Sequence, residues 1–319
     1  MIELVRELHD KKYSVLEIES INKLAMENPE ELVRRSEEYY NNQVMKAART
    51  VIDSGGKYKF ILLCGPSASG KTTTAHKLKH RLIAQGVGSQ VVSMDDFYRG
   101  MAFYPLREDG TPDMESVETL DMDLLNKCFY ELMDKGEAMF PVFDFASQEQ
   151  RLGDHKIALG ENDILIMEGI HALNPMVLCD IPEENIYRIY VSVRTKFVDG
   201  DETLLVPKDI RLLRRMVRDS KFRNYPLVHT LEYWSHVVAS ERINIDLYRD
   251  DVDLKMDNTI DYEVCLWNKI LHTAMENLDE NIFEKYPQIE KITKMLMNFR
   301  ELDHIHIPKN SLLREFIGD

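Results

Sequence analysis

The amino-acid sequence predicts an α/β fold in which a mostly parallel β-sheet carries α-helices on both faces. Two observations support this prediction. Short, almost entirely apolar runs recur from residue 58 onward, and they have the length and composition of buried strands. Longer stretches with helical periodicity separate these runs. Such alternation is typical of βαβ units, which place their strands in one parallel sheet.

The expected elements follow one another in a regular order. Strands are expected at residues 60–64, 90–94, 164–167 and 186–193. Helices are expected at residues 71–85, 121–135, 208–218 and 228–249. We therefore divide the chain into an N-terminal helical extension (1–55), a core (56–275) and a C-terminal helix with a tail (276–319).

The N-terminal extension is expected to be helical and separate from the core. The stretch Glu30–Ile52 contains neither Gly nor Pro, follows Pro29 and ends at Ser54-Gly55-Gly56. A first-turn proline and a terminal glycine pair are the signals that begin and end a helix. The segment contains no set of residues that indicates chemistry, so packing or homo-oligomerisation is the expected role.

Composition narrows the classes of function. The chain has 319 residues, of which 44% are hydrophobic, and a formal net charge of −15 at pH 7. Nonspecific nucleic-acid binding is not expected, because so acidic a chain repels phosphates. No apolar run approaches the length of a membrane span, and the first ten residues lack a signal-peptide pattern, so a cytoplasmic location is expected. Four cysteines in apolar stretches are predicted to be buried structural thiols: Cys64, Cys128, Cys179 and Cys265.

The strongest motif lies between the first predicted strand and the first predicted core helix. Residues 65–72, GPSASGKT, match G-x-x-x-x-G-K-[ST], and this strand–loop–helix context is the one in which the motif binds phosphate. Lys71 would reach the β- and γ-phosphates, and the Thr72 hydroxyl would ligate Mg²⁺. The predicted donor-binding residues are Gly65, Ser67, Ala68, Ser69, Gly70, Lys71, Thr72 and Thr73. The motif predicts a P-loop NTPase-type fold that binds ATP or GTP together with Mg²⁺.

Acidic residues follow two further strands. Asp95 and Asp96 come after strand 90–94, and Glu168 comes after strand 164–167. Ligands bind at the carboxyl ends of parallel strands, so these side chains are expected to face the phosphate loop. One of the two aspartates could accept the proton of an acceptor hydroxyl, and the spacing does not choose between them. Glu168 has the position of an acid that holds Mg²⁺.

A strongly basic stretch runs from residue 208 to residue 223. It contains seven basic and two acidic residues, a local charge of +5 in a chain of −15. Arg211, Arg215 and Arg218 share one face of the predicted helix. This pattern indicates a lid helix that presents guanidinium groups to phosphates.

Taken together, these motifs resemble the uridine kinase and phosphoribulokinase family of P-loop kinases. The matching segments are residues 65–73, 93–98 (SMDDFY), 141–145 (PVFDF), 166–171 (IMEGIH) and 211–219 (RLLRRMVRD). The tail at residues 310–318 (NSLLREFIG) is similar to the ending of a bacterial uridine kinase-like branch. Many members of that branch carry an N-terminal module related to threonyl-tRNA synthetase, where this sequence has only the short extension.

The resemblance implies a role for individual residues. Asp95 matches the aspartate that serves as the base for a nucleoside 5′-hydroxyl and lies near the metal, with Lys71 and Arg218 as further catalytic groups. Arg211 and Arg215 match donor-binding arginines of the lid, and Glu168 matches the acid near Mg²⁺. The implied acceptor-binding residues are Tyr98, Glu115, Phe143, Gln148 and Arg223.

Two positions depart from the pattern of uridine–cytidine kinases, which place Tyr and His around the pyrimidine edge. This sequence has Phe143 and Gln148 there. Phenylalanine stacks on a base but cannot hydrogen-bond its edge, so discrimination among bases is expected to be weak.

A kinase of uridine and cytidine is the leading interpretation. A kinase of another small alcohol, such as a sugar or sugar phosphate, is the alternative, followed by a nucleotide-binding interaction protein without catalysis. A GTPase switch would require Asn-Lys-x-Asp, and the segment 268–271 (NKIL) lacks the Asp.

Overall fold

The computed structural model describes residues 7–9, 13–145, 147–177, 181–223, 225–275 and 280–318. Its centre is a five-stranded sheet in which every neighbouring pair of strands is parallel. Across the sheet the order is β11 (Leu254–Asp257), β8 (Ile186–Ser192), β3 (Phe60–Cys64), β7 (Ile164–Gly169) and β4 (Ser89–Ser93). The predicted parallel α/β sheet is therefore confirmed.

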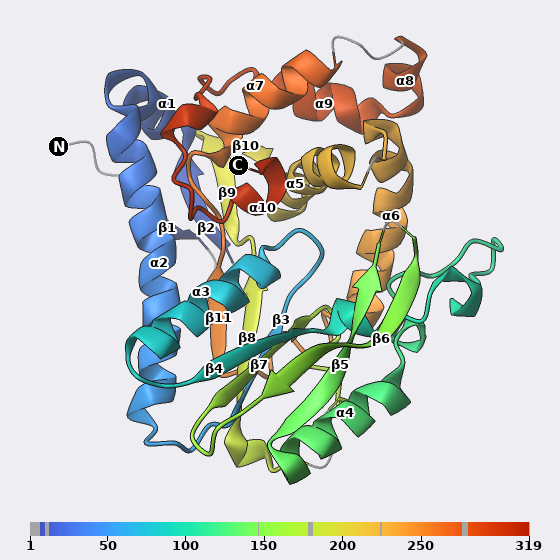
Figure 1. The fold of residues 1–319 in the computed structure, drawn as a ribbon. Coiled ribbons are helices and arrows are strands. Elements are labelled where there is room, and N and C mark those ends of the chain that lie inside the picture. Colours follow the sequence, from blue (N-terminus) through green and yellow to red (C-terminus); the bar gives the residue numbers. More distant parts are fainter. Residues whose placement is uncertain are drawn as a thin grey trace.

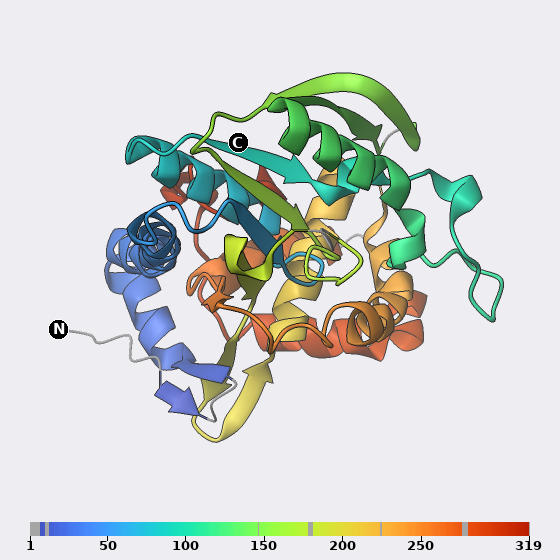
Figure 2. The same ribbon diagram turned by 90° about the horizontal axis from the view of Figure 1, so that it is seen from below.

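The sheet separates two hydrophobic cores. Side chains alternate along β3, so Ile61 and Leu63 belong to one core and Phe60 and Leu62 to the other. The first core also contains residues of α2 (Pro29–Asp53), α3 (Lys71–Ala84), α5 (Pro207–Phe222), α6 (Leu227–Asn244) and α7 (Glu263–Met275). The second contains residues of α4 (Met122–Lys135). Helices thus cover both faces, as predicted (Figures 1 and 2).

The predicted core elements agree with the structure except at a few ends. The largest displacement of a single end is at α6, which ends at Asn244 rather than at residue 249. The antiparallel hairpin of β5 (Glu137–Asp144) and β6 (Glu149–Ala158) was not predicted. Its strands mix charged and apolar residues, and it forms a two-stranded sheet outside the parallel one. Pro141 interrupts the apolar residues of β5, and β6 is largely polar, so neither shows the sequence pattern of a buried strand.

The N-terminal extension is only partly helical, which corrects the expectation. Two short strands, β1 (Glu7–His9) and β2 (Tyr13–Glu17), precede α1 (Ile18–Glu27) and α2. They form a four-stranded sheet with β9 (Thr195–Asp199) and β10 (Glu202–Leu205), in the order β1-β2-β9-β10. Because the partner of β2 lies about 180 residues away, local sequence carries no sign of the pairing.

The long helix α2 packs against the core rather than standing apart from it. It begins at Pro29, and the Asn28 side chain caps it by accepting a hydrogen bond from the Glu31 N–H. The Tyr40 hydroxyl lies 2.9 Å from Oγ1 of Thr74 in α3, the helix that follows the phosphate loop. Figure 1 shows α2 running along one side of the molecule. The extension thus supports the helix on which the predicted donor site depends.

The C-terminal part contributes α8 (Glu280–Lys285), α9 (Pro287–Leu296) and the single turn α10 (Arg314–Ile317). Figure 1 shows α10 beside α5, and Phe316 and Ile317 are buried there. The thiols Cys64, Cys128 and Cys265 are buried and unpaired, and Cys179 lies outside the described residues. Within the described ranges, no helix is both long and apolar enough to cross a membrane.

Candidate active site

Three parallel strands end at one edge of the sheet, and a cavity of about 850 Å³ lies there. The phosphate loop follows β3, and Glu168 is the penultimate residue of β7. Asp95 follows β4 in a short 3₁₀ turn (Met94–Phe97). Lys71, Thr72, Asp95 and Glu168 all line the cavity. The structure therefore brings together the four residues on which the sequence argument depends most.

The loop conformation explains its two glycines in different ways. A Cβ on Gly65 would lie 2.0 Å from the Val191 carbonyl oxygen, so Gly65 is required for close packing against β8. Gly70 has a φ of +83° and would place a Cβ 2.6 Å from Cδ1 of Leu312 in the C-terminal tail. Ala68 also adopts the left-handed region, with a φ of +58°. A conformation of this kind costs about 1–2 kcal/mol for a residue with a Cβ, so other contacts must hold the loop in place.

Glu168 is the buried centre of the predicted metal site. Its Oε1 atom accepts hydrogen bonds from Thr72 Oγ1 at 3.0 Å and from Ser93 Oγ at 2.8 Å. Burial, together with the negative charge of Asp95, raises the pKa of Glu168 to about 7. The carboxyl is therefore divided between its neutral and ionised forms near neutral pH.

The structure distinguishes the two aspartates that the sequence left equivalent. The Asp96 carboxylate accepts a hydrogen bond from the Phe143 N–H at 3.1 Å, and its backbone carbonyl accepts one from Gln150 Nε2. Asp96 thus anchors the β5–β6 hairpin. Across the part of the chain that the structure describes, the Asp95 carboxylate has no hydrogen-bond or ion-pair partner, and it lines the cavity. Asp95 is therefore available to an acceptor hydroxyl.

Three arginines of the basic stretch line the same cavity: Arg215, Arg218 and Arg223. All three form ion pairs with Asp219, at distances of 3.2 to 3.5 Å. Burial opposes ionisation of Asp219, but the three guanidinium groups hold its pKa below the usual value. Burial and the adjacent Arg223 lower the pKa of Arg218 to about 10, which leaves it charged at neutral pH. Asp219 holds the three cations together above the phosphate loop.

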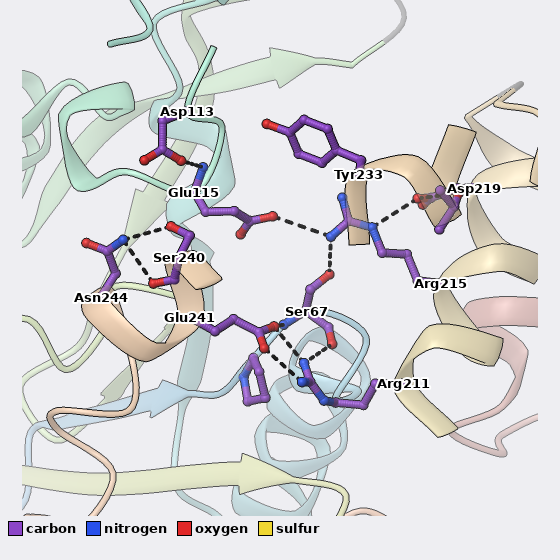
Figure 3. A network of polar contacts seen from close by, with 12 residues as sticks. Ser67, Asp113, Glu115, Arg211, Arg215, Asp219, Tyr233, Ser240, Glu241 and Asn244 are labelled. Atoms are coloured by element: carbon purple, nitrogen blue, oxygen red, sulfur yellow. Dashed lines mark hydrogen bonds and ion pairs between the residues drawn. The ribbon is translucent and has the colours of Figure 1, made fainter. Parts of the chain in front are cut away.

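Arg211 was predicted to bind the donor, and the structure places its guanidinium against the Ser67 carbonyl of the phosphate loop. It lies outside the lining of this cavity, where it forms a buried, bidentate ion pair with Glu241 of α6 at 2.6 and 2.8 Å. The same ion pair binds both backbone polar groups of Ser67 in the phosphate loop (Figure 3). Arg211 donates to the Ser67 carbonyl at 3.0 Å, and Glu241 accepts from the Ser67 N–H at 3.0 Å. Its partner Glu241 already satisfies the guanidinium, so Arg211 positions the loop.

Two further arginines of α5 also hold the phosphate loop. Arg214, which the sequence argument missed, is fully buried in an ion pair with Glu263 and donates to the Ala68 carbonyl at 3.3 Å. Arg215 donates to Oγ of Ser67 at 2.9 Å and to Glu115 at 3.3 Å (Figure 3). The strained turn at Ala68 is thus fixed from α5. Neither Glu241 nor Glu263 could be found from local pattern, because each lies 30 or more residues from its arginine.

Several aromatic side chains also line the cavity. Tyr98, Glu115, Gln148 and Arg223 line it as predicted, but Phe143 is buried and does not. The Phe143 ring packs edge-on against Tyr98 and Phe145 in the second core. Phe145 reaches the cavity instead, with Arg223 over its ring at 5.2 Å. Further aromatic lining comes from Tyr104, Tyr225, His229 and Tyr233.

Comparison with known proteins identifies the family of the chain. Residues 60–254, more than half of the chain, match the model of the Phosphoribulokinase / Uridine kinase family. The chain belongs to this family. Similar proteins include the uridine kinase of Staphylococcus carnosus (strain TM300), which is 27% identical over 176 residues, 55% of this chain and 75% of the relative. The uridine kinase of Ureaplasma urealyticum serovar 10 is 26% identical over 179 residues, 56% of this chain and 77% of the relative.

Among solved structures, a putative fructose transport system kinase from Silicibacter sp. TM1040 is similar, with 19% identity and a TM-score of 0.47. The match covers 67% of this chain and 98% of the chain of that kinase. In this member of the phosphoribulokinase and uridine kinase family, the phosphate loop and the acidic strand ends line one cavity. The matched region 60–254 ends before the C-terminal tail that contacts the phosphate loop.

Proposed function

We propose that this protein transfers the γ-phosphoryl group of ATP or GTP to a hydroxyl group of a small acceptor, with uridine or cytidine as the leading acceptors. The observation that carries this proposal is the position of Asp95. Its carboxylate has no partner among the described residues and shares one cavity with Lys71, Thr72 and Glu168. A free carboxylate beside a phosphate loop fits a base that orients a hydroxyl and accepts its proton.

Different residues of the cavity would have different roles in phosphoryl transfer. Lys71 donates to the Pro66 carbonyl at 3.3 Å in this structure, which keeps its charge at the loop. Lys71, Arg215 and Arg218 would neutralise the charge of the donor phosphates. Arg218 would stabilise the negative charge of the transferred phosphoryl group. Asp95 would take the proton of the acceptor hydroxyl as the new oxygen–phosphorus bond forms. Attack on the γ-phosphorus then releases the nucleoside diphosphate.

The donor set around Glu168 fits Mg²⁺. Thr72 and Glu168 offer a hydroxyl and a carboxylate, and Asp95 adds a second carboxylate on the same cavity. No group of three or more His, Cys, Asp or Glu residues that could hold a metal occurs within the described ranges. Mg²⁺ is commonly bound by one or two carboxylates together with substrate phosphates. Held by Thr72, Glu168 and Asp95, the ion would neutralise negative charge on the donor phosphates.

The raised pKa of Glu168 gives this site a pH signature. A cation binds the ionised carboxylate, so binding must displace any proton present. Because the pKa of Glu168 is raised, we expect binding of the Mg²⁺–ATP complex to release more protons from Glu168 at pH 6 than at pH 8. Calorimetric titrations in buffers of different ionisation enthalpy measure this release. Glu168→Gln serves as the control that subtracts protons from the nucleotide, and equal release from both proteins at pH 6 would contradict the assignment.

The aromatic lining of the cavity supports a nucleoside as the acceptor. Stacking between aromatic rings suits a planar base, and buried Glu115 suits ribose hydroxyls. Burial raises the pKa of Glu115, and its bond to Arg215 opposes that shift. A sugar or sugar phosphate is the alternative, which the acidic and basic lining would also accommodate. Steady-state kinetics on uridine, cytidine, sugars and sugar phosphates separate the two. Turnover confined to sugars would replace the nucleoside proposal and leave the roles of Lys71 and Asp95 in place.

Phe145 lines the cavity, whereas Phe143 is buried in the core. Alanine variants at these two positions should therefore have different effects. Phe145→Ala should raise the KM for the acceptor about five- to tenfold, as expected from loss of one stacking contact, with stability nearly unchanged. Phe143→Ala should instead lower the free energy of unfolding by about 3–5 kcal/mol, because Phe143 is a core residue. Acceptor kinetics and urea unfolding of both variants test this. The reverse pattern would restore Phe143 as the acceptor-binding ring.

A further inference from the structure

The C-terminal tail places a carboxylate on the phosphate loop. Glu315 in α10 accepts a hydrogen bond from Oγ1 of Thr73 at 2.7 Å and another from the Thr73 backbone N–H at 3.3 Å. Thr73 is the third residue of α3, and the first N–H groups of a helix have no partner within it. These N–H groups, with the positive end of the helix dipole, are the donors that bind phosphate after a P-loop. Glu315 thus occupies part of the predicted donor site.

The tail is fixed firmly enough to keep this carboxylate in place. Leu312, Leu313 and Phe316 are fully buried, and the Phe316 ring lies 5.3 Å from the guanidinium of Arg214. Leu312 packs so closely on Gly70 that a Cβ at Gly70 would clash with it. Glu315 itself is only half-buried and lines the active-site cavity. Its side chain can therefore turn away while the rest of the tail stays docked.

Carboxyl groups outnumber basic side chains in the cavity lining, so a further anion meets electrostatic repulsion there. Four permanently charged cations line it: Lys71, Arg215, Arg218 and Arg223. Six carboxyl groups line it: Asp95, Asp96, Glu115, Glu168, Asp219 and Glu315. A triphosphate brings several more negative charges to the loop. Asp219, Glu115 and Asp96 are held by partners, whereas the partner of Glu315 is the helix terminus that the phosphates would take.

We propose that Glu315 is a built-in competitor for the donor phosphates, and that its carboxylate leaves the N-terminus of α3 when a nucleoside triphosphate binds. This inference rests on the proposed function, because it takes a triphosphate as the ligand of the loop. The tail then lowers the affinity of the donor site and keeps the phosphate loop ordered between turnovers. A phosphate oxygen takes over the Thr73 hydrogen bonds that Glu315 releases.

Binding of inorganic tripolyphosphate and of ATP, both without Mg²⁺, tests this inference by calorimetry. Glu315→Gln keeps the size of the side chain but removes its charge. We expect it to bind both ligands about tenfold more tightly than the wild type, as removal of one like charge a few ångströms from a phosphate predicts. Glu315→Ala should show the same direction. Glu301→Gln removes the same charge at an exposed position that does not line the cavity, and it should bind like the wild type.

The outcomes separate the inference from the proposed function. If the wild type binds both ligands and neither Glu315 variant binds them more tightly, the inference is overturned and the proposed function stands. Weaker binding by the variants than by the wild type would make Glu315 a donor-binding residue. An equal gain in Glu301→Gln would reduce the effect to net charge and also overturn it. If no protein bound either ligand, the donor site itself would fail, and the proposed function with it. Thermal melting of each variant confirms that the fold is retained.

Discussion

Replacement of Asp95 by asparagine is expected to lower kcat by about 10² to 10⁴, with the affinity for ATP within about threefold of the wild type. Asparagine preserves the size of the side chain but cannot accept the proton of the acceptor hydroxyl. The carboxylate has no partner in the described part of the chain, so its loss removes no structural contact. Steady-state kinetics and nucleotide titration of the same preparation measure the two quantities separately.

Asp96→Asn is the matched control. The asparagine oxygen can still accept the hydrogen bond from the Phe143 N–H, so the hairpin anchor survives. We expect a loss in kcat of less than about tenfold. A large loss in Asp96→Asn and a small one in Asp95→Asn would reverse the assignment of the base.

Breaking the buried pair of Arg211 and Glu241 beside the phosphate loop is expected to have a large effect on stability. Glu241→Gln leaves Arg211 charged and without its carboxylate in a site where both residues are buried. Removal of one partner of such a pair costs about 3–5 kcal/mol, because the remaining charge is desolvated and uncompensated. Urea unfolding, monitored by circular dichroism, gives the change in the free energy of unfolding.

The double variant Arg211→Met with Glu241→Leu distinguishes positioning from stability. Apolar replacement of a complete buried pair is often close to neutral for stability, so much of the lost stability should return. The Ser67 N–H and carbonyl group would still lack the partners that hold the loop. We therefore expect the KM for ATP to remain raised, by about tenfold, while the KM for the acceptor changes little. A normal KM for ATP in a stable double variant would show that the pair serves stability alone.

The central sheet and the phosphate loop could be predicted because their signals are local. The apolar run Phe60–Cys64 and the Gly-Lys-Thr motif occupy consecutive residues, and the structure confirms the strand and the helix that follows. Asp95 and Glu168 were placed correctly at one sheet edge, because parallel strands end together. The roles of these residues in binding and chemistry stay predictions.

The features that sequence analysis missed depend on partners far away in the chain. Helix periodicity places Arg211 and Arg215 on one face but does not reveal Glu241, which draws Arg211 away from the cavity. Phe143 matched a family position, yet its ring turns into the core and Phe145 reaches the ligand space. No local pattern in the tail predicts a contact with the donor site, and only the structure shows that Leu312 packs on Gly70 and that Glu315 accepts hydrogen bonds from Thr73.

The fate of the γ-phosphoryl group of labelled ATP tests the central claim most directly. The wild-type protein is incubated with γ-labelled ATP, Mg²⁺ and uridine, cytidine or a sugar, and the labelled products are separated. The account predicts that the label moves to the acceptor, that uridine or cytidine becomes a labelled monophosphate, and that Asp95→Asn slows this transfer by about 10² to 10⁴. Binding of ATP without transfer of label to any acceptor, or label found only in inorganic phosphate, would contradict the account.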